Sequence, residues 1–262
     1  MKILKTFCCL LFFILGAAVC AFSKDKIWNE EKSSHFEIFY KTAPKDFVKN
    51  VEKMAEHYYD DIYDNLGLGH YQSWSWDDRA KIYIYDDEDD YVQNAGQFAW
   101  SHGVASPQGK MIRTFPSAHG FFDSTLPHEL GHIVFREMVG FQTDVPLWFE
   151  EGVAMFQEQA KRFGSHKAVQ EAIKNGKFIP LDELAHLRLD NRSDDALVQL
   201  FYAESASVVY YLIEQYGTER FKRLCREMKE KGSFEMTLGS VYYRIKSTDG
   251  LNKEWVKYLT NE

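Results

Sequence analysis

One segment of the sequence combines residue types and a spacing suited to metal chemistry: His128-Glu129-Leu130-Gly131-His132. On a helix, residues four apart lie on the same face one turn apart, so the two imidazoles can bind one metal ion. The carboxylate of Glu129 is then placed to accept a proton from a water bound to that metal. A motif with two free positions also arises by chance on surface helices. The surrounding sequence is therefore needed to distinguish a metal site from a chance match.

The residues around the motif predict a helix that would hold both histidines in this geometry. Ser124 or Thr125 can cap its N-terminus, Pro127 falls in the first turn, and Gly140 suits its C-terminal end. Gly131 lowers the stability of this helix by about 1 kcal/mol relative to alanine. A glycine at that position therefore suggests that another segment packs closely against the helix.

A second acidic segment follows at a distance that could complete a metal site. Eighteen residues separate His132 from Glu151, which is enough chain to finish one helix, turn and begin another. A carboxylate on that second helix, from Glu151 or the neighbouring Glu150, can close a site of two histidines and one glutamate. Such a site leaves the fourth position to water, as catalytic zinc requires.

These two segments resemble the gluzincin zinc metallopeptidases, and most closely the peptidase MA-like family. The resemblance is most specific in Leu126–His132 and Pro146–Ala154 and extends over about residues 27–260. In that family the zinc-binding glutamate immediately precedes the glycine of the second segment. The resemblance therefore implies Glu151 as a ligand, with Glu150 as the alternative.

The resemblance also implies a mechanism. It implies one Zn²⁺ ion with three protein ligands, which are His128, His132 and Glu151. Glu129 would act as general base and later give its proton to the leaving amine, while the metal lowers the pKa of the attacking water towards about 7. It does not indicate whether cleavage is of the endopeptidase or exopeptidase type.

An oxyanion stabiliser would have to come from another part of the chain. Related gluzincins often use a tyrosine or histidine outside the zinc helices, and the candidate here is Tyr202. The small residues Ala203, Ser205 and Ala206 would let its helix pack closely on the site. A role for Tyr202 in the hydrophobic core is the competing interpretation, and His102 and His119 are weaker candidates.

Two further side chains have a functional and an ordinary interpretation. Glu158 lies about two helical turns beyond Glu151 and could orient a metal ligand, but a solvated glutamate is the favoured interpretation. Cys225 lies in a basic amphipathic run, where we interpret it as a small buried residue rather than a catalytic thiol.

The elements that must position these residues follow an α+β order. Alternating apolar residues predict strands at 35–41, 81–85 and about 110–115, and helical spacing predicts a helix from Pro44 to Gly67. A peptide substrate could add a strand at the sheet edge, for which residues 97–115 are the best candidate. From Ser124 onwards the pattern is helical, with breaks expected at 140–146, 164, 175–180, 191–195, 217 and 232.

These elements predict an α+β fold, and the resemblance implies that it is zincin-like. We expect a single peptidase domain over residues 22–262. A small mixed sheet would occupy about residues 27–120. A mostly helical half, about residues 121–262, would carry the active-site helix.

Residues 1–21 have the features of a secretory signal peptide. Lys2 and Lys5 precede an uncharged apolar run, and small residues end at Ala21, where we expect cleavage. A lipid anchor at Cys20 is the minor alternative, because Val19 is a poor residue before a lipidated cysteine. We therefore expect an exported protein, periplasmic or secreted.

The composition limits the partners that the chain can have. With 45% hydrophobic and 27% charged residues the chain can bury a core, and its net charge of −8 argues against nucleic-acid binding. No stretch after the leader approaches about 18 continuous apolar residues, so we expect no membrane span in the mature chain. The sequence predicts an exported zinc peptidase with peptide or protein substrates. A zinc-stabilised envelope binding protein without activity, or a zinc hydrolase of another bond, remains the alternative.

Overall fold

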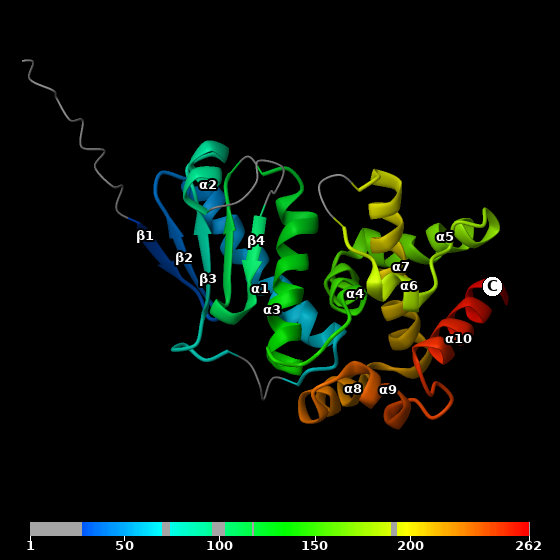
Figure 1. Ribbon diagram of the computed structural model, residues 1–262. Helices are drawn as coiled ribbons and strands as arrows, with labels where there is room; N and C mark the ends of the chain where they lie inside the picture. The colour runs from blue at the N-terminus through cyan, green and yellow to red at the C-terminus, as the bar shows by residue number, and fades with distance from the viewer. Residues whose placement is uncertain (1–27, 70–73, 96–102, 117, 190–192, 262) are drawn as a thin grey trace, which may run out of the picture.

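The computed structural model describes residues 28–261 apart from 70–73, 96–102, 117 and 190–192 (Figure 1). The expected signal peptide, Cys20 and His102 lie outside the described residues.

The N-terminal half contains a mixed five-stranded sheet with the order β1-β2-β3-β5-β4. Its strands are β1 (Asn29–Lys32), β2 (Phe36–Tyr40), β3 (Ala80–Ile84), β4 (Gly103–Ser106) and β5 (Met111–Thr114). The three central strands, β2, β3 and β5, run parallel, whereas β1 and β4 pair antiparallel at the two edges. The segment expected at a sheet edge, 97–115, thus includes the edge strand β4 but also β5, which lies inside the sheet.

Alternation along the strands places one face of the sheet in the core. Phe36, Ile38, Ile82, Ile84 and Ile112 are all fully buried. Against the sheet pack α1 (Lys45–Asn65), which connects β2 to β3, and α3 (Leu126–Val139). A smaller cluster joins Tyr91 of α2 (Glu88–Ala95) to Tyr85 and Phe115, which directly follow β3 and β5.

The helix α3 stands between the sheet and the helical half (Figure 1). As the sequence predicts, Pro127 lies in its first turn and Gly140 ends it with a φ of 88°. The predicted N-cap is wrong. A short π-helical turn, Phe121–Thr125, runs directly into α3, so Thr125 has helical dihedral angles, and neither hydroxyl caps the helix. The Ser124 hydroxyl instead donates to Glu158.

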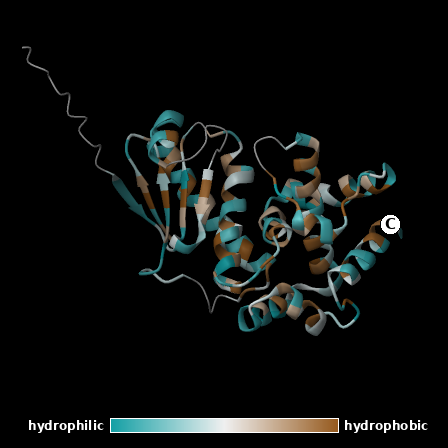
Figure 2. Ribbon diagram, viewed as in Figure 1, coloured by the Kyte–Doolittle hydropathy of each residue, from teal (hydrophilic) through white to brown (hydrophobic). Residues whose placement is uncertain are grey.

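The C-terminal half is built almost entirely from helices around α7. They are α4 (Leu147–Gln157), α5 (Gln159–Lys174), α6 (Leu181–His186), α7 (Asp195–Tyr216), α8 (Thr218–Lys231), α9 (Phe234–Val241) and α10 (Thr248–Asn261). The central α7 packs against α4, α5 and α8. Hydrophobic residues concentrate in the strands and central helices, whereas α2 and α8 are mainly hydrophilic (Figure 2).

Most predicted helix ends agree with the structure, but one break is wrong. The helix α5 continues through Gly164 without interruption. The chain turns instead at Glu158, which has an extended conformation between α4 and α5. No glycine or proline marks that position, so the sequence pattern did not reveal it.

Among the described helices, α7 is long and apolar enough to cross a membrane by length and composition alone. Half of its most apolar window is buried inside the fold, where it packs against α4 and α5. A core helix passes the same test, and the packing of α7 accounts for its apolar composition.

The structure confirms the predicted α+β class, with a small mixed sheet followed by a mostly helical half. One apolar core extends from the sheet through α3 into the helical half. Cys225 is fully buried in that core, as expected. Burial raises the pKa of its thiol, so Cys225 stays protonated and inert.

Candidate metal centre

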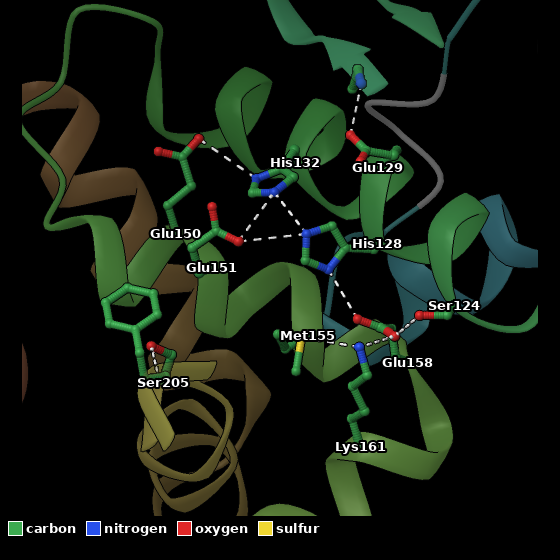
Figure 3. Close-up of polar contacts among 12 residues, drawn as sticks. Ser124, His128, Glu129, His132, Glu150, Glu151, Met155, Glu158, Lys161 and Ser205 are labelled. Carbon is green, nitrogen blue, oxygen red and sulfur yellow. Dashed lines mark hydrogen bonds and ion pairs between the residues drawn. The ribbon is translucent and has the colours of Figure 1, made fainter. Parts of the chain in front are cut away.

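The helix α3 presents His128 and His132 on one face, one turn apart (Figure 3). Their Nε2 atoms lie 3.1 Å apart. The two nitrogens thus point at a common position, as the four-residue spacing predicts.

Glu151 approaches the same position from α4 (Figure 3). Its Oε2 atom lies 3.5 Å from Nε2 of His128 and 3.7 Å from Nε2 of His132. In a tetrahedral zinc site with bonds of about 2.0–2.1 Å, neighbouring ligand atoms are about 3.3 Å apart. The three donor atoms therefore fit a tetrahedral metal site with one position left for another ligand.

The packing of α4 explains why Glu151 points toward α3. Trp148 and Phe149, in the first turn of α4, are fully buried, and both rings contact Phe234 of α9. These two aromatic residues anchor the start of the helix in the core. The glutamates that follow them are thereby held on the side of α4 that faces α3.

Two glycines set the distances between these helices. A Cβ atom on Gly131 would lie 3.1 Å from Cα of Ala154, so α3 and α4 approach closely there. This confirms the close packing that Gly131 suggested. A Cβ atom on Gly152 would lie only 2.2 Å from the carbonyl oxygen of Ser205, so α4 and α7 also touch through their backbones.

Glu150, the alternative ligand, is held away from the cluster. Nε of Arg136 donates to its Oε1 atom at 2.7 Å, and a second guanidinium nitrogen pairs with Oε2. Burial by itself would raise the pKa of Glu150, but His132 and Arg136 lower it to about 2. Its Oε1 atom lies 3.7 Å from Nδ1 of His132, on the side of the ring that faces away from Glu151.

Glu158 is buried, so the favoured interpretation of a solvated side chain is wrong. Only 2% of Glu158 is exposed. Nδ1 of His128 donates to its Oε1 atom at 3.0 Å. The Ser124 hydroxyl donates to Oε2, which also pairs with the ammonium of Lys161 at 2.9 Å (Figure 3). Glu158 thus orients the ring of His128 and directs its Nε2 toward Glu151.

The negative charge around His128 favours a cation at the centre of the cluster. Burial by itself would lower the pKa of His128, but hydrogen bonds to Glu151 and Glu158 raise it to about 9. The nearby charge of Glu129 adds to this effect. The same field that favours a proton on His128 favours a divalent metal ion in its place.

Glu129 lies beside the cluster and makes a separate contact. Its Oε2 atom accepts a hydrogen bond from the backbone N–H of Ala105 in β4 at 2.7 Å (Figure 3). Burial raises the pKa of its carboxyl despite the opposing effect of the two histidines. A carboxylate with a raised pKa is a stronger base, which suits a group that must accept a proton near neutral pH.

A cavity of about 670 Å³ opens beside the cluster, and its lining includes His128, Glu129, Glu158 and Tyr202. Burial, together with the negative charge of Glu151, raises the pKa of Tyr202 to about 12. Tyr202 therefore keeps its phenolic proton and can donate a hydrogen bond. It also packs against the core, as the competing interpretation expected, and its role as oxyanion stabiliser stays a prediction.

Of the other histidines named by the sequence analysis, His102 lies outside the described residues and His119 does not join the centre. His119 is exposed in the segment before α3 and is not among the described residues that line the cavity. The residue that sequence reasoning undervalued is Glu158. Its distance of seven residues from Glu151 was a signal, but the turn at the end of α4 decides its direction.

Comparisons with known proteins add independent information. A family model described as the peptidase MA superfamily matches residues 74–261. Among solved structures, native yeast LTA4 hydrolase aligns with 12% identity and a TM-score of 0.50 over 86% of this chain and 38% of that chain. A mutant M1 zinc metallopeptidase from Deinococcus radiodurans aligns with 10% identity and a TM-score of 0.46, over 87% and 50%.

The chain thus spans half or less of the length of these two proteins. At such low identity the likeness to yeast LTA4 hydrolase concerns the fold alone. No curated protein sequence matches the chain.

Proposed function

The chain belongs to the peptidase MA superfamily, and on that premise we propose that it is a zinc-dependent peptidase of the gluzincin type. The observation that carries this proposal is the convergence of His128, His132 and Glu151 from two helices. Their donor atoms lie within 4.8 Å of one another, at spacings suited to one tetrahedral Zn²⁺ ion with an open position.

When bound, zinc supplies Lewis acidity, which lowers the pKa of water and polarises a carbonyl group. The chain supplies the proton transfers. Glu129 accepts a proton on its carboxylate from the attacking water and returns it to the nitrogen of the leaving amine. Tyr202 keeps its phenolic proton and donates a hydrogen bond to the carbonyl oxygen of the substrate, on which negative charge develops.

The surroundings of Glu129 support this role. The hydrogen bond from Ala105 fixes one carboxylate oxygen against β4, and the residue lines the cavity in which a substrate would lie. Gly103, at the start of β4, lines the same cavity. A peptide lying along this end of the edge strand would therefore pass directly beside Glu129.

Replacement of the base tests the proposal. Glu129→Gln keeps the shape of the side chain but cannot accept the proton, so we expect zinc binding to persist and hydrolysis to fall about 100- to 10,000-fold. Zinc content is measured by elemental analysis, and hydrolysis with a peptide library in the presence and absence of a chelator. Glu230→Gln, an exposed position on α8, is the matched control.

Full peptide hydrolysis by the Glu129→Gln variant would contradict the assigned role. A wild-type protein that binds zinc but cleaves no peptide would favour the alternative of a zinc-stabilised binding protein.

We also propose that the protein is exported. The support is the pattern of residues 1–21, with Lys2 and Lys5 before an apolar run that ends in small residues. Cleavage after Ala21 would leave Phe22 as the first residue of the mature chain. Intact mass measurement of the protein from its native host tests this, and a diacylglycerol-sized mass increase on Cys20 would show lipidation instead.

A further inference from the structure

A second cavity lies near the C-terminal end of α3, away from the metal cluster. Its volume is about 360 Å³, and it is bounded by the last turns of α3, the end of α1 with the segment that follows it, and α8. It shares no lining residue with the cavity beside the metal ligands. Glu137 in its wall lies nine residues beyond His128, which is about 13 Å along the helix axis. This second cavity is therefore separate from the candidate active site.

The wall that α8 contributes is positively charged. Lys222, Arg226 and Lys229 follow one another at intervals of four and three residues, so they lie on one face of the helix, and all three line the cavity. Within the described part of the chain, Arg226 and Lys229 form no ion pair with a carboxylate, and Lys222 pairs with Glu219 only at 3.9 Å. These three cations are therefore available to an anionic partner.

The acidic residues of the cavity have a cation of their own. Asp78 and Glu137, in the walls opposite α8, both pair with the ammonium of Lys110 at 2.5 Å. The excess of positive charge extends along the chain, since residues 218–246 contain eight Lys or Arg and four Glu, a net charge of +4, whereas the whole chain carries −8. Positive charge is thus concentrated at this end of the molecule, where it attracts anions.

Large apolar side chains project into solvent near these cations. Trp76 is 75% exposed, in the same segment that supplies Asp78 to the cavity. Met236 of α9 is 68% exposed, and Tyr243, which follows α9, is 69% exposed. The helix α9 packs against α8 (Figure 1), and Arg223 of α8 interacts with the Tyr243 side chain. Trp and Tyr favour the boundary between lipid and water, and nearby Lys and Arg attract anionic headgroups.

We propose that this basic face, formed by α8, α9 and residues 74–79, binds the surface of an anionic phospholipid membrane. Lys222, Arg226 and Lys229 bind lipid phosphate groups at the cavity, while Trp76 and Tyr243 enter the interface. Single projecting side chains can enter a fluid interface, whereas a protein partner requires a complementary packed patch. The inference concerns a second site and does not depend on the peptidase activity.

Binding to vesicles is the first test. Residues 22–262 contain the whole described fold, and without residues 1–21 neither a leader nor a lipid on Cys20 can hold the protein on a membrane. Cosedimentation compares vesicles of phosphatidylcholine alone with vesicles that also contain phosphatidylglycerol. We expect the affinity to be at least about tenfold higher with phosphatidylglycerol. It should fall when the salt concentration is raised from about 0.1 M to about 0.5 M, because salt screens the attraction.

Charge reversal is the second test. Arg226→Glu combined with Lys229→Glu should lower the affinity for phosphatidylglycerol vesicles at least about tenfold. The control combines Lys49→Glu with Lys167→Glu, at exposed positions of α1 and α5 outside the basic face. It changes the net charge equally and should stay within about threefold of the wild type. Circular dichroism and zinc content establish that each variant is folded and loaded.

Entry of Trp76 into the interface is the third test. Trp76 is the most exposed tryptophan of the described residues. Its transfer from water into the interface should shift the tryptophan emission to shorter wavelength when the protein binds vesicles. Trp76→Ala should lose this shift and bind about three- to tenfold more weakly.

The outcomes distinguish a lipid surface from other anions. Equal affinity for both kinds of vesicle, or wild-type affinity of the Arg226→Glu, Lys229→Glu variant, would overturn the inference. Release from vesicles by about 10 mM glycerol phosphate would overturn it in favour of a soluble phosphate compound, and equally tight binding to polyglutamate in favour of an acidic protein. Hydrolysis of soluble peptides by the charge-reversed variant should equal that of the wild type.

Discussion

The carboxylate of Glu158 acts on the candidate metal site through its hydrogen bond with His128. It is buried with three partners, the His128 ring, the Ser124 hydroxyl and the Lys161 ammonium. Burial by itself would raise the pKa of Glu158, but these partners lower it, so the carboxylate stays charged. A charged acceptor at Nδ1 keeps the proton of His128 on that nitrogen and leaves Nε2 available to a metal.

Removal of that charge should weaken the metal site. Glu158→Gln retains an acceptor oxygen but loses the negative charge, so we expect the zinc affinity to fall about 10- to 100-fold. Competition with a chromophoric chelator measures the affinity, with Glu230→Gln as the surface control. An affinity equal to that of the wild type would show that the contact with His128 has no positioning role.

At the scale of elements, the site depends on how closely three helices approach. The helix α4 lies between α3 and α7, and Gly131 and Gly152 are the points of closest contact. The turn at Glu158 then separates α4 from α5 and directs the carboxylate back toward α3. Helix spacing, rather than any loop, therefore holds the candidate ligands together.

Two glycine substitutions should have opposite effects. Gly152→Ala places a methyl group 2.2 Å from a backbone oxygen of α7, where no side-chain movement can relieve the clash. We expect it to lower the free energy of unfolding by about 1–3 kcal/mol. Gly164→Ala meets open space and should raise it by up to about 1 kcal/mol. Thermal unfolding measures both, at about 2–4 °C per kcal/mol.

The two variants form a matched pair, since each adds one methyl group to a helical glycine. Equal melting temperatures for the two would contradict the close approach of α4 and α7 at Ser205.

At the scale of the whole molecule, one apolar core joins the sheet to the helical half, and it contains an uncompensated acid. Glu204 of α7 is fully buried. Its Oε1 atom accepts a hydrogen bond from the Ile179 N–H at 3.0 Å, while Oε2 has no hydrogen-bond partner among the described residues. Burial raises the pKa of its carboxyl from 4.5 to about 8.

This acid should make global stability depend on pH. Between pH 4.5 and about 8 the folded state keeps a proton on Glu204 that the unfolded chain releases, so stability decreases as the pH rises through this window. Glu204→Gln cannot ionise and should gain stability relative to the wild type over the same window, by a few kcal/mol at most. Urea unfolding at about pH 5 and about pH 8 measures the difference. If the free energies of unfolding of Glu204→Gln and the wild type differed by the same amount at both pH values, this prediction would be contradicted.

Much of the molecule could be predicted because it depends on local spacing. The four-residue interval between His128 and His132 places both rings on one helix face wherever that helix lies. Alternation in the strands and periodicity in the helices likewise require only neighbours in the chain, and the α+β order follows from them. Local patterns gave three wrong predictions, which were an N-cap at Ser124 or Thr125, a helix break at Gly164 and a solvated side chain at Glu158.

The class of fold, the helix that carries the two histidines and the nearby acidic segment are therefore predictable from local patterns. Three features follow only from the packing of the folded chain: Glu151 meets the histidines while Glu150 turns to Arg136, Glu158 is buried against His128, and Gly164 lines a cavity. The reason is physical. Each of these outcomes depends on contacts between segments far apart in the chain, and the spacing of residues along one segment does not specify what packs against it.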